Sequence, residues 1–366
     1  MDDWKDLRYK GELHAYMIPP TDLNDTYGEL EGVDWSTLSI TAQYYSDTRT
    51  SGSLTFVNTN WIPDSFIRIV YEVPERDYKR VLGTYAVTDA PETYENGQWK
   101  TTATLHSMLY TMSLDIAANR KTLKKNALYT TAMKSELLAA DREYILEDAL
   151  EGRVSSTTVM PSGVSRLARM FTFCQNTNNR LDVDPEGRIT VEPYTKPAAK
   201  SSKLTVDIED ERGLTMDGIT RSTNYATVPT SAAVIYRYTE QVGGKSVERE
   251  ISAVAMVSTA SHQHQMHRGY NVVDLHTLSE MQPATEARAQ KLALAYLAND
   301  GGEKVEWEFK MKYLPLWEGD VVDLVVSSGN ERYSGTRKCL VKNITLTGPY
   351  LDMQLTLKET ASGDTE

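Results

Sequence analysis

Cysteine is scarce in this chain, and long apolar runs are missing. The 366 residues include only Cys174 and Cys339, each among apolar neighbours, so a disulfide framework is excluded and assembly in a reducing compartment is favoured. No segment reaches the ~18 consecutive apolar residues of a membrane-spanning helix. Residues 1–6 have neither the basic nor the apolar region of a signal peptide. We therefore expect no membrane span and no export by such a signal.

Basic residues are also under-represented. The chain has 39 Lys and Arg against 51 Asp and Glu, which gives a formal net charge of -12. Affinity for nucleic acid rests on Lys and Arg that neutralise phosphates, so specific nucleic-acid binding is not expected. A protein that must not retain DNA would carry this charge balance.

Signatures of catalysis are absent from the sequence. There is no Gly-x-Ser-x-Gly elbow and no His-Glu-x-x-His motif. Cys174 lacks the flanking residues of cysteine proteases, and its helical setting indicates a core position. We expect a protein that is not an enzyme, with no catalytic residue and no cofactor.

Three segments imitate ligand sites. Gly244-Lys245-Ser246 resembles the end of a phosphate-binding loop, but Thr239 stands where a second glycine is needed. Asp182, Asp184, Glu186 and Gly187 resemble a calcium loop, but its twelfth position is a proline. A hairpin turn is the better interpretation of both. His262, His264 and His267 fit a polar loop better than a metal site, which stays open as the less favoured alternative.

Strand patterns dominate the outer parts of the chain. Strands are predicted in the following segments, with loose alternation around a turn in the first: 36–57 (two strands), 66–73, 80–88, 98–116, 204–208, 224–228, 232–240, 247–256 and four more after residue 302. The first 118 residues are therefore expected to form an antiparallel barrel or sandwich. Tyrosine, at 21 residues, suits such half-exposed strands and wet interfaces.

The middle of the chain has a different character. Residues 121–150 lack proline and glycine and are rich in Ala, Leu, Lys and Glu, which predicts helix. A second helix is predicted over 164–175, followed by a hairpin over 181–193. We therefore expect a small α/β unit over 119–200, with a linker at 196–202. The clearest helix of the chain is predicted over 283–298.

The order of these segments resembles phage tail hubs. It is similar to the baseplate hub of contractile-tailed phages and to the N-terminal hub region of tail-associated lysin proteins of siphophages. Four stretches carry the resemblance: the 181–191 hairpin, the 224–228 strand, the 283–298 helix before Trp307-Glu308-Phe309, and 314–324 with its Gly319-Asp320 turn. The resemblance implies an α+β, mostly β fold, with two barrel-like antiparallel tube domains and peripheral α/β insert domains.

The resemblance also implies domain limits. We expect a first tube-like barrel over 1–118, completed by about 201–225, and the peripheral α/β domain over 119–200. A second tube-like barrel is expected over 226–366, with a helical or loop-rich peripheral part over about 257–302.

The function implied is a structural tail hub that joins the tail tube to the tip and forms the channel for DNA ejection. Expected partners are two further copies in a homotrimer, the distal tail or tail tube ring, the tape-measure protein and tail fibre or tip proteins. The protein would be located at the virion tail tip, which is assembled in the host cytoplasm. A carbohydrate- or receptor-binding tail module is the alternative, and a cell-wall hydrolase is a weaker one.

One acidic cluster is the candidate lining of the channel. Asp207, Glu209, Asp210 and Glu211 crowd between two predicted strands. Carboxylates along a channel would repel the DNA phosphates, so DNA would not bind to the channel wall. The alternative is that these charges only keep the outer surface soluble.

Overall fold

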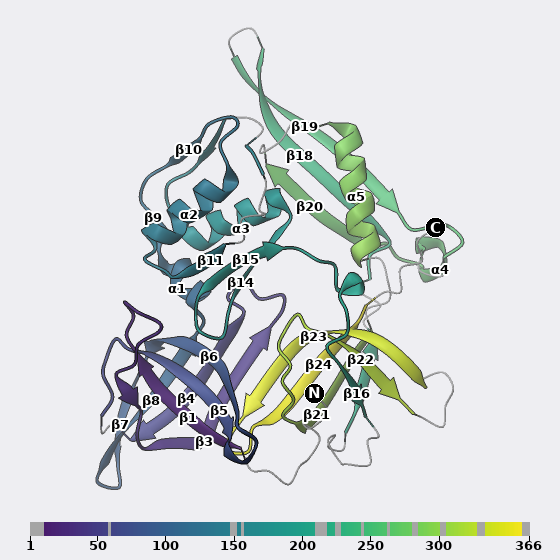
Figure 1. Ribbon diagram of the computed structural model, residues 1–366. Coiled ribbons are helices and arrows are strands. Elements are labelled where there is room, and N and C mark those ends of the chain that lie inside the picture. Colours follow the sequence, from purple (N-terminus) through teal and green to yellow (C-terminus); the bar gives the residue numbers. More distant parts are fainter. Residues whose placement is uncertain are drawn as a thin grey trace.

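The chain is α+β and mostly β, as the sequence predicts (Figure 1). The computed structural model describes residues 11–57, 60–146, 152–154, 157–208, 218–223, 228–242, 245–261, 264–279, 285–300, 305–327 and 334–360. Two β units lie side by side, and an α/β unit and a small helix-backed sheet lie on the same side of them. No helix in the described part of the chain has the length and apolar character to cross a bilayer.

The first β unit comes from the N-terminal part of the chain. Its strands pair antiparallel in the order β3-β4-β8-β6-β5-β1-β2, and β7 extends β8 as a hairpin. Alternation sets the inner face, as in β3, where Leu38, Ile40 and Ala42 are buried. The elements are β1 (Glu12–Ile18), β2 (Gly28–Glu29), β3 (Val33–Gln43), β4 (Thr50–Val57), β5 (Phe66–Val73), a 3-10 turn (Pro74–Arg76), β6 (Tyr78–Asp89), β7 (Glu92–Glu95) and β8 (Gln98–His106).

The second β unit is mostly C-terminal. β21 pairs with β24, β24 with β23 and β23 with β22, all antiparallel. We expected 201–225 to complete the first β unit; instead, β16 pairs in parallel with β22, and β17 pairs with β21. Sequence alternation does not say which neighbour a short strand will meet. The strands are β16 (Leu204–Asp207), β17 (Thr220–Thr223), β21 (Val305–Lys312), β22 (Val321–Val326), β23 (Gly335–Thr347) and β24 (Asp352–Glu359).

The two β units are joined edge to edge. β23 pairs antiparallel with β3, with Thr345 opposite Thr41 and Leu346 opposite Ile40, so one 14-stranded sheet runs through both units. We call this pairing the β3–β23 seam. The pairings among described residues leave the sheet open and do not close a barrel.

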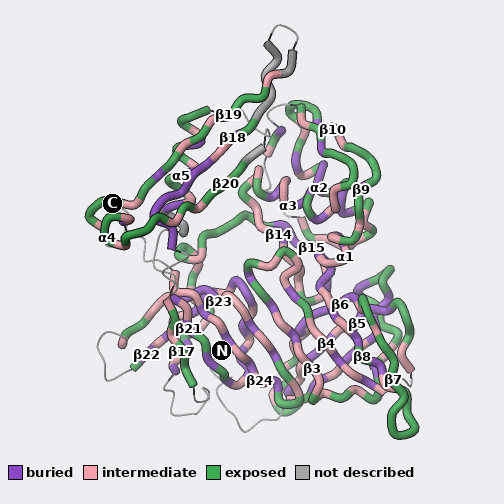
Figure 2. Tube along the Cα trace, turned by 180° about the vertical axis from the view of Figure 1, so that it is seen from behind, coloured by how far each residue is buried: buried purple, intermediate pink, exposed green. Residues whose placement is uncertain are grey.

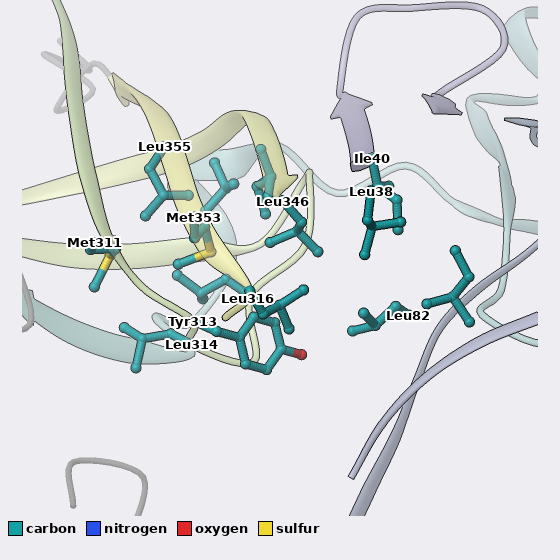
Figure 3. Close-up of a cluster of buried hydrophobic side chains, with 14 of the residues drawn as sticks. Leu38, Ile40, Leu82, Met311, Tyr313, Leu314, Leu316, Leu346, Met353 and Leu355 are labelled. Carbon is teal, nitrogen blue, oxygen red and sulfur yellow. The ribbon is translucent and has the colours of Figure 1, made fainter. Parts of the chain in front are cut away.

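One hydrophobic core spans the seam. The buried cluster includes residues of both β units, and Tyr71 of the first packs edge-on against Tyr313 of the second, with ring centroids 5.0 Å apart. Figure 3 shows the side chains of Leu38 and Ile40 beside those of Leu316 and Leu346. The two units are thus packed as a single apolar body.

The α/β unit follows β8. Its elements are α1 (Met108–Leu114), β9 (Ile116–Ala117), β10 (Lys121–Leu123), α2 (Tyr129–Ala139), β11 (Tyr144–Leu146), β12 (Thr158–Met160), β13 (Val164–Ser165), α3 (Arg166–Thr177), β14 (Asn179–Val183), β15 (Ile189–Pro193) and a 3-10 turn (Pro197–Ala199). The predicted second helix and the hairpin are confirmed as α3 and β14–β15.

Two details of this unit differ from the prediction. The strand pattern predicted over 98–116 ends at His106, and α1 follows. The helix predicted over 121–150 is confined to α2, flanked by β10 and β11. These three-residue strands are fixed by distant partners, because β11 runs parallel to β15 and β10 pairs with β12. Local composition does not contain that information.

A third sheet is separate from the β units. β18 (Ser231–Val242) pairs with β19 (Lys245–Met256) and, in parallel, with β20 (Val273–Ser279). α4 (Gln265–Arg268) precedes β20, and α5 (Glu286–Asp300) covers one face, where Val234 and Ala293 are buried. We expected 232–240 and 247–256 to belong to the second barrel; the strands are confirmed, but they form this small sheet instead. The peripheral part therefore begins near residue 231, before the predicted 257.

Candidate functional site at the junction of three units

The turn before β22 is the point where three units meet. The predicted Gly319-Asp320 turn is present, and Asp320 holds it: Oδ2 accepts the Trp317 N–H at 2.7 Å and pairs with Lys203 at 2.7 Å. Gly319 has φ +84, and a Cβ there would lie 2.6 Å from Arg180 Nη1 of the α/β unit and 3.0 Å from the Tyr44 ring of the first β unit. Only glycine fits this close approach without strain.

Glu318 is buried at this meeting point, with 6% of its surface exposed. Its Oε2 atom is buried without a hydrogen-bond partner. Burial, together with the neighbouring Asp182 carboxylate, raises the pKa of Glu318 to about 8, against the opposing effect of Arg180 and Arg49. The protonated form of Glu318 is therefore favoured relative to an exposed glutamate.

The charged partners come from different units. Asp182 of β14 pairs with Arg180 Nη2 at 2.5 Å and lies 3.8 Å from the Nε of Arg49, which follows β3. The Arg180 guanidinium lies over the Tyr44 ring, 4.1 Å from its centroid. Arg49 Nη2 also donates to the Leu181 carbonyl at 3.0 Å.

Lys200 completes the cluster from the connector after the α/β unit. Its Nζ donates to the Gly319 carbonyl at 3.0 Å. We name Arg49, Arg180, Asp182, Lys200 and Glu318 the polar junction. Its contacts link both β units and the α/β unit, so the polar junction can fix their relative orientation.

The segment that imitates a calcium loop is a hairpin turn, as predicted. The Asp184 carboxylate accepts the Arg188 N–H at 2.8 Å and its Nε–H at 2.6 Å. Arg188 thus occupies the carboxylate that a cation would need. The tip of the turn docks on the first β unit, where Thr84 Oγ1 donates to the Pro185 carbonyl and Arg68 to the Glu186 carbonyl, both at 3.0 Å.

The other two motifs also have structural roles. Val242 pairs with Lys245 across β18 and β19, which confirms a hairpin at the Gly244-Lys245-Ser246 motif; Gly244 itself is outside the described residues. His264 is buried, and its Nδ1 accepts the Met266 N–H at the start of α4. His267 lies against the Thr259 carbonyl, and His262 is outside the described residues. Among the residues that the structure describes, no three His, Cys, Asp or Glu side chains gather to hold a metal.

The acidic candidates for a channel lining are only partly described. Asp207 ends β16, opposite Val325 of β22, and is half-buried. Glu209, Asp210 and Glu211 lie outside the described residues. Their role in a channel stays a prediction.

The polar junction was not found from the sequence. Arg49, Arg180 and Glu318 are far apart in the chain, and no sequence pattern connects them. The one available signal was the Gly319-Asp320 turn, which marked the position next to Glu318 but said nothing of its burial.

Comparisons with known proteins bear on the fold. No protein-family model matches the sequence, and no curated protein matches it. The tail protein of Neisseria meningitidis has a similar structure, with a TM-score of 0.67 and 10% identity over 96% of this chain and 97% of that one. The 43 kDa tail protein of prophage MuSo2 from Shewanella oneidensis gives a TM-score of 0.63 and 10% identity, over 95% and 98%.

A third similar structure belongs to a larger assembly. A chain of the Francisella PdpA-VgrG complex gives a TM-score of 0.56 and 10% identity over 97% of this chain and 59% of that one. The predicted likeness to phage tail hubs is thereby confirmed at the level of fold. The chain has the fold of phage tail proteins, along nearly its whole length.

Proposed function

We propose that this chain is a structural hub of a phage-like tail, which joins the tail tube to the tip and surrounds the channel for DNA ejection. The observation that carries the proposal is the β3–β23 seam. It fuses two β units into one sheet with one core, so a single chain presents two wall segments side by side. The shared fold with tail proteins over almost all of the chain supports the same role.

We propose that three chains assemble into the hub. Three chains with two β units each would present six wall segments, which matches the six-fold symmetry of a tail tube. Closed cyclic assemblies need complementary surfaces on each copy, and the open sheet has unpaired edges at β2 and β17 among the described strands. The partners would be the tube or distal tail ring, the tape-measure protein and fibre or tip proteins, at the virion tail tip.

The test is the assembly state of the full chain. Native mass spectrometry should find three copies, and electron microscopy should find a ring whose channel admits duplex DNA. A stable monomer, a ring of two or six copies, or a trimer without a channel would contradict the proposal.

We propose no catalytic role, cofactor or bound metal for the chain. Incubation with peptidoglycan and polysaccharides should yield no product. Cleavage that disappears when one carboxylate is replaced by its amide would contradict this part of the proposal.

One observation favours the alternative of a carbohydrate-binding module. Tyr94 and Trp99 face each other across the β7–β8 hairpin, 61% and 53% exposed, with ring centroids 5.3 Å apart. Exposed aromatic pairs of this kind stack on sugar rings. Binding of host glycans that is lost in Trp99→Ala, with the trimer intact, would support this second function.

A further inference from the structure

The continuous sheet has an uncharged patch on its outward face, around the β3–β23 seam. The inner residues of β23, β3, β4 and β8 form the core, and their alternate neighbours point outward. Around the β3–β23 seam, the outward residues of these strands are hydroxyl or amide side chains, which are half-buried or exposed: Ser39, Thr41, Gln43, Ser51, Ser53, Thr55, Thr102, Thr104, Asn343, Thr345 and Thr347. Charged or titratable side chains lie elsewhere on the same strands, among them Asp34, Lys100, His106, Lys338 and Lys342. We name the uncharged set the hydroxyl face.

The strand register arranges the hydroxyl face in rows that cross the seam. Thr345 lies opposite Thr41, which lies opposite Ser51. In the next row, Ser39 is flanked by Thr347 and Ser53. Ser53 in turn lies opposite Thr104 of β8. From β23 to β4 each row crosses the seam without a charged side chain, and the strands lie side by side in Figure 2. Beyond these strands the first row reaches His106, and the second is flanked by Asp352 and Asp89.

Hydroxyls within these rows contact one another. Thr41 and Thr345 are 3.3 Å apart at Oγ1, and Thr55 and Thr102 are 3.1 Å apart. A hydroxyl that bonds to its neighbour still has capacity for water. The hydroxyl face is thus polar and uncharged.

The same sheet provides an internal comparison. The outward residues of β21 alternate Glu306, Glu308, Lys310 and Lys312, which is ordinary for an outer strand. At this margin the charges pair, as in Lys312 with Asp352 at 2.7 Å and Lys342 with Glu306 at 2.6 Å. In a chain that is 25% charged, the uncharged hydroxyl face departs from the alternation of charges on β21 of the same sheet.

Strand propensity alone does not account for this composition. Threonine favours strands, but serine and asparagine do not, and they share these positions. Charged side chains on an outer face also protect a sheet from aggregation. Their absence over this area points to a surface that is enclosed when the protein is assembled.

We propose that the hydroxyl face lines the channel of the assembled hub and contacts the passing DNA. This inference rests on the proposed tail-hub function and names the wall of its channel. A neutral wall offers no lysine or arginine to bind phosphate and no carboxylate to repel it. DNA would slide past water-bound hydroxyls, and its passage would depend little on salt. The wall formed by the hydroxyl face would thus be neutral.

The first test adds positive charge to the face. In Ser53→Lys/Thr345→Lys the two lysines lie on strands that are not neighbours, so they do not face each other. Its matched control is Ser252→Lys/Thr277→Lys, on exposed strand positions of the separate small sheet. Each assembled ring is mixed with one duplex DNA in linear form and as a relaxed closed circle, because only the linear form can thread a channel.

The expected result separates the two variants. The face variant should bind linear DNA at least tenfold more tightly than the circle. With six lysines around one duplex, its affinity should fall with salt at a log–log slope of about -5. The control should bind both forms equally. Its log–log slope of affinity against salt should be about -2 when one duplex contacts the two lysines of a single chain. The unsubstituted ring should retain neither form. Equal binding of circle and linear DNA by the face variant would overturn the proposal.

A second test does not depend on the lysine variants folding. Ser53→Cys is nearly isosteric, and the native Cys174 and Cys339 are both buried. In the ring, this cysteine should react with a small maleimide and at least tenfold more slowly with a bulky polyethylene-glycol maleimide. Equal reaction with both would place the face outside. Protection from both would make the face a protein interface, and either result would overturn the inference. Failure of the proposed hub function would be seen separately, because native mass spectrometry would then give a mass other than that of three chains.

Discussion

The β3–β23 seam and the polar junction both hold units of this protein together, but by different forces. The seam joins the two β units through paired strands over a dry core in which Leu346 and Ile40 are fully buried. The polar junction joins the α/β unit to both through half-buried arginines, the half-buried Asp182 and the buried Glu318, whose Oε2 has no hydrogen-bond partner. Apolar burial stabilises without regard to pH, whereas buried ionisable groups stabilise only in the right protonation state.

This difference indicates separate tasks. A seam that forms a channel wall should be permanent, since its disruption opens the wall. A junction that orients a peripheral unit can tolerate adjustment, because its net contribution to stability is small: desolvation of the charges offsets much of their attraction.

The largest effect is expected from a cavity at the seam. Leu346→Ala should lower the free energy of unfolding by about 2–5 kcal/mol, because the fully buried side chain leaves a void between the two β units. Urea unfolding should show one shifted transition for both units, since they share a core. Leu294→Ala on α5, where the side chain is 53% exposed, is the control and should change stability by no more than about 0.5 kcal/mol. Separate transitions for the two β units would refute the single core.

The polar junction should make the stability of the protein depend on pH. With its pKa raised to about 8, Glu318 holds a proton in the folded chain over a range where the unfolded chain releases it. Stability should therefore fall as pH rises from about 4.5 to about 8, and level off above. Glu318→Gln should match the unsubstituted protein at pH 4.5 and exceed it at pH 8 by on the order of 2–4 kcal/mol.

The measurement is the difference in unfolding free energy between the two proteins at each pH. This difference cancels the titration of all other groups. Glu31→Gln, at an exposed position, should show no such trend. A constant difference between Glu318→Gln and the unsubstituted protein from pH 4.5 to 9 would contradict the buried, protonated state.

A smaller effect is expected at the dock of the 184–188 turn. Arg68 donates to Thr84 Oγ1 at 2.8 Å and to the carbonyls of Leu23 and Glu186 at 2.7 and 3.0 Å. Arg68→Met should cost about 1–3 kcal/mol, because it leaves part-buried acceptors unpaired. Hydrogen exchange should rise in β14 and β15 more than in β23. An equal rise of hydrogen exchange in β14–β15 and in β23 would mean that the α/β unit does not move independently.

The smallest effect should be local to the α/β unit. Ser165 accepts the Ala168 N–H at 3.2 Å as the N-cap of α3, so Ser165→Ala should cost about 1 kcal/mol. Its pH profile should run parallel to that of the unsubstituted protein, since the cap does not touch the polar junction. Ser165→Asp should restore the cap. A changed pH profile in Ser165→Ala would show that the polar junction is coupled to the stability of the whole α/β unit.

Local patterns predicted much of the fold. Residues 66–73 are rich in β-branched and aromatic residues, and β5 has the predicted limits; the amphipathic spacing at 164–175 predicted α3. Segments whose state depends on distant partners were not predicted, such as β20, which is a strand because β18 lies beside it. The order of segments was sufficient to indicate the tail-hub fold despite identities near 10%.

By itself, the sequence determined the mostly β character, the lack of a disulfide framework, and the hairpins at 184–188 and at Gly244-Lys245-Ser246. Periodicity and turn residues act between neighbours, so they can be read along the chain. Only the tertiary structure decided that β3 and β23 pair, that Glu318 meets Arg180 and Asp182, and that outward serines and threonines align in one neutral face. These features join residues up to three hundred positions apart, and strand register, which composition does not encode, sets which side chains become neighbours.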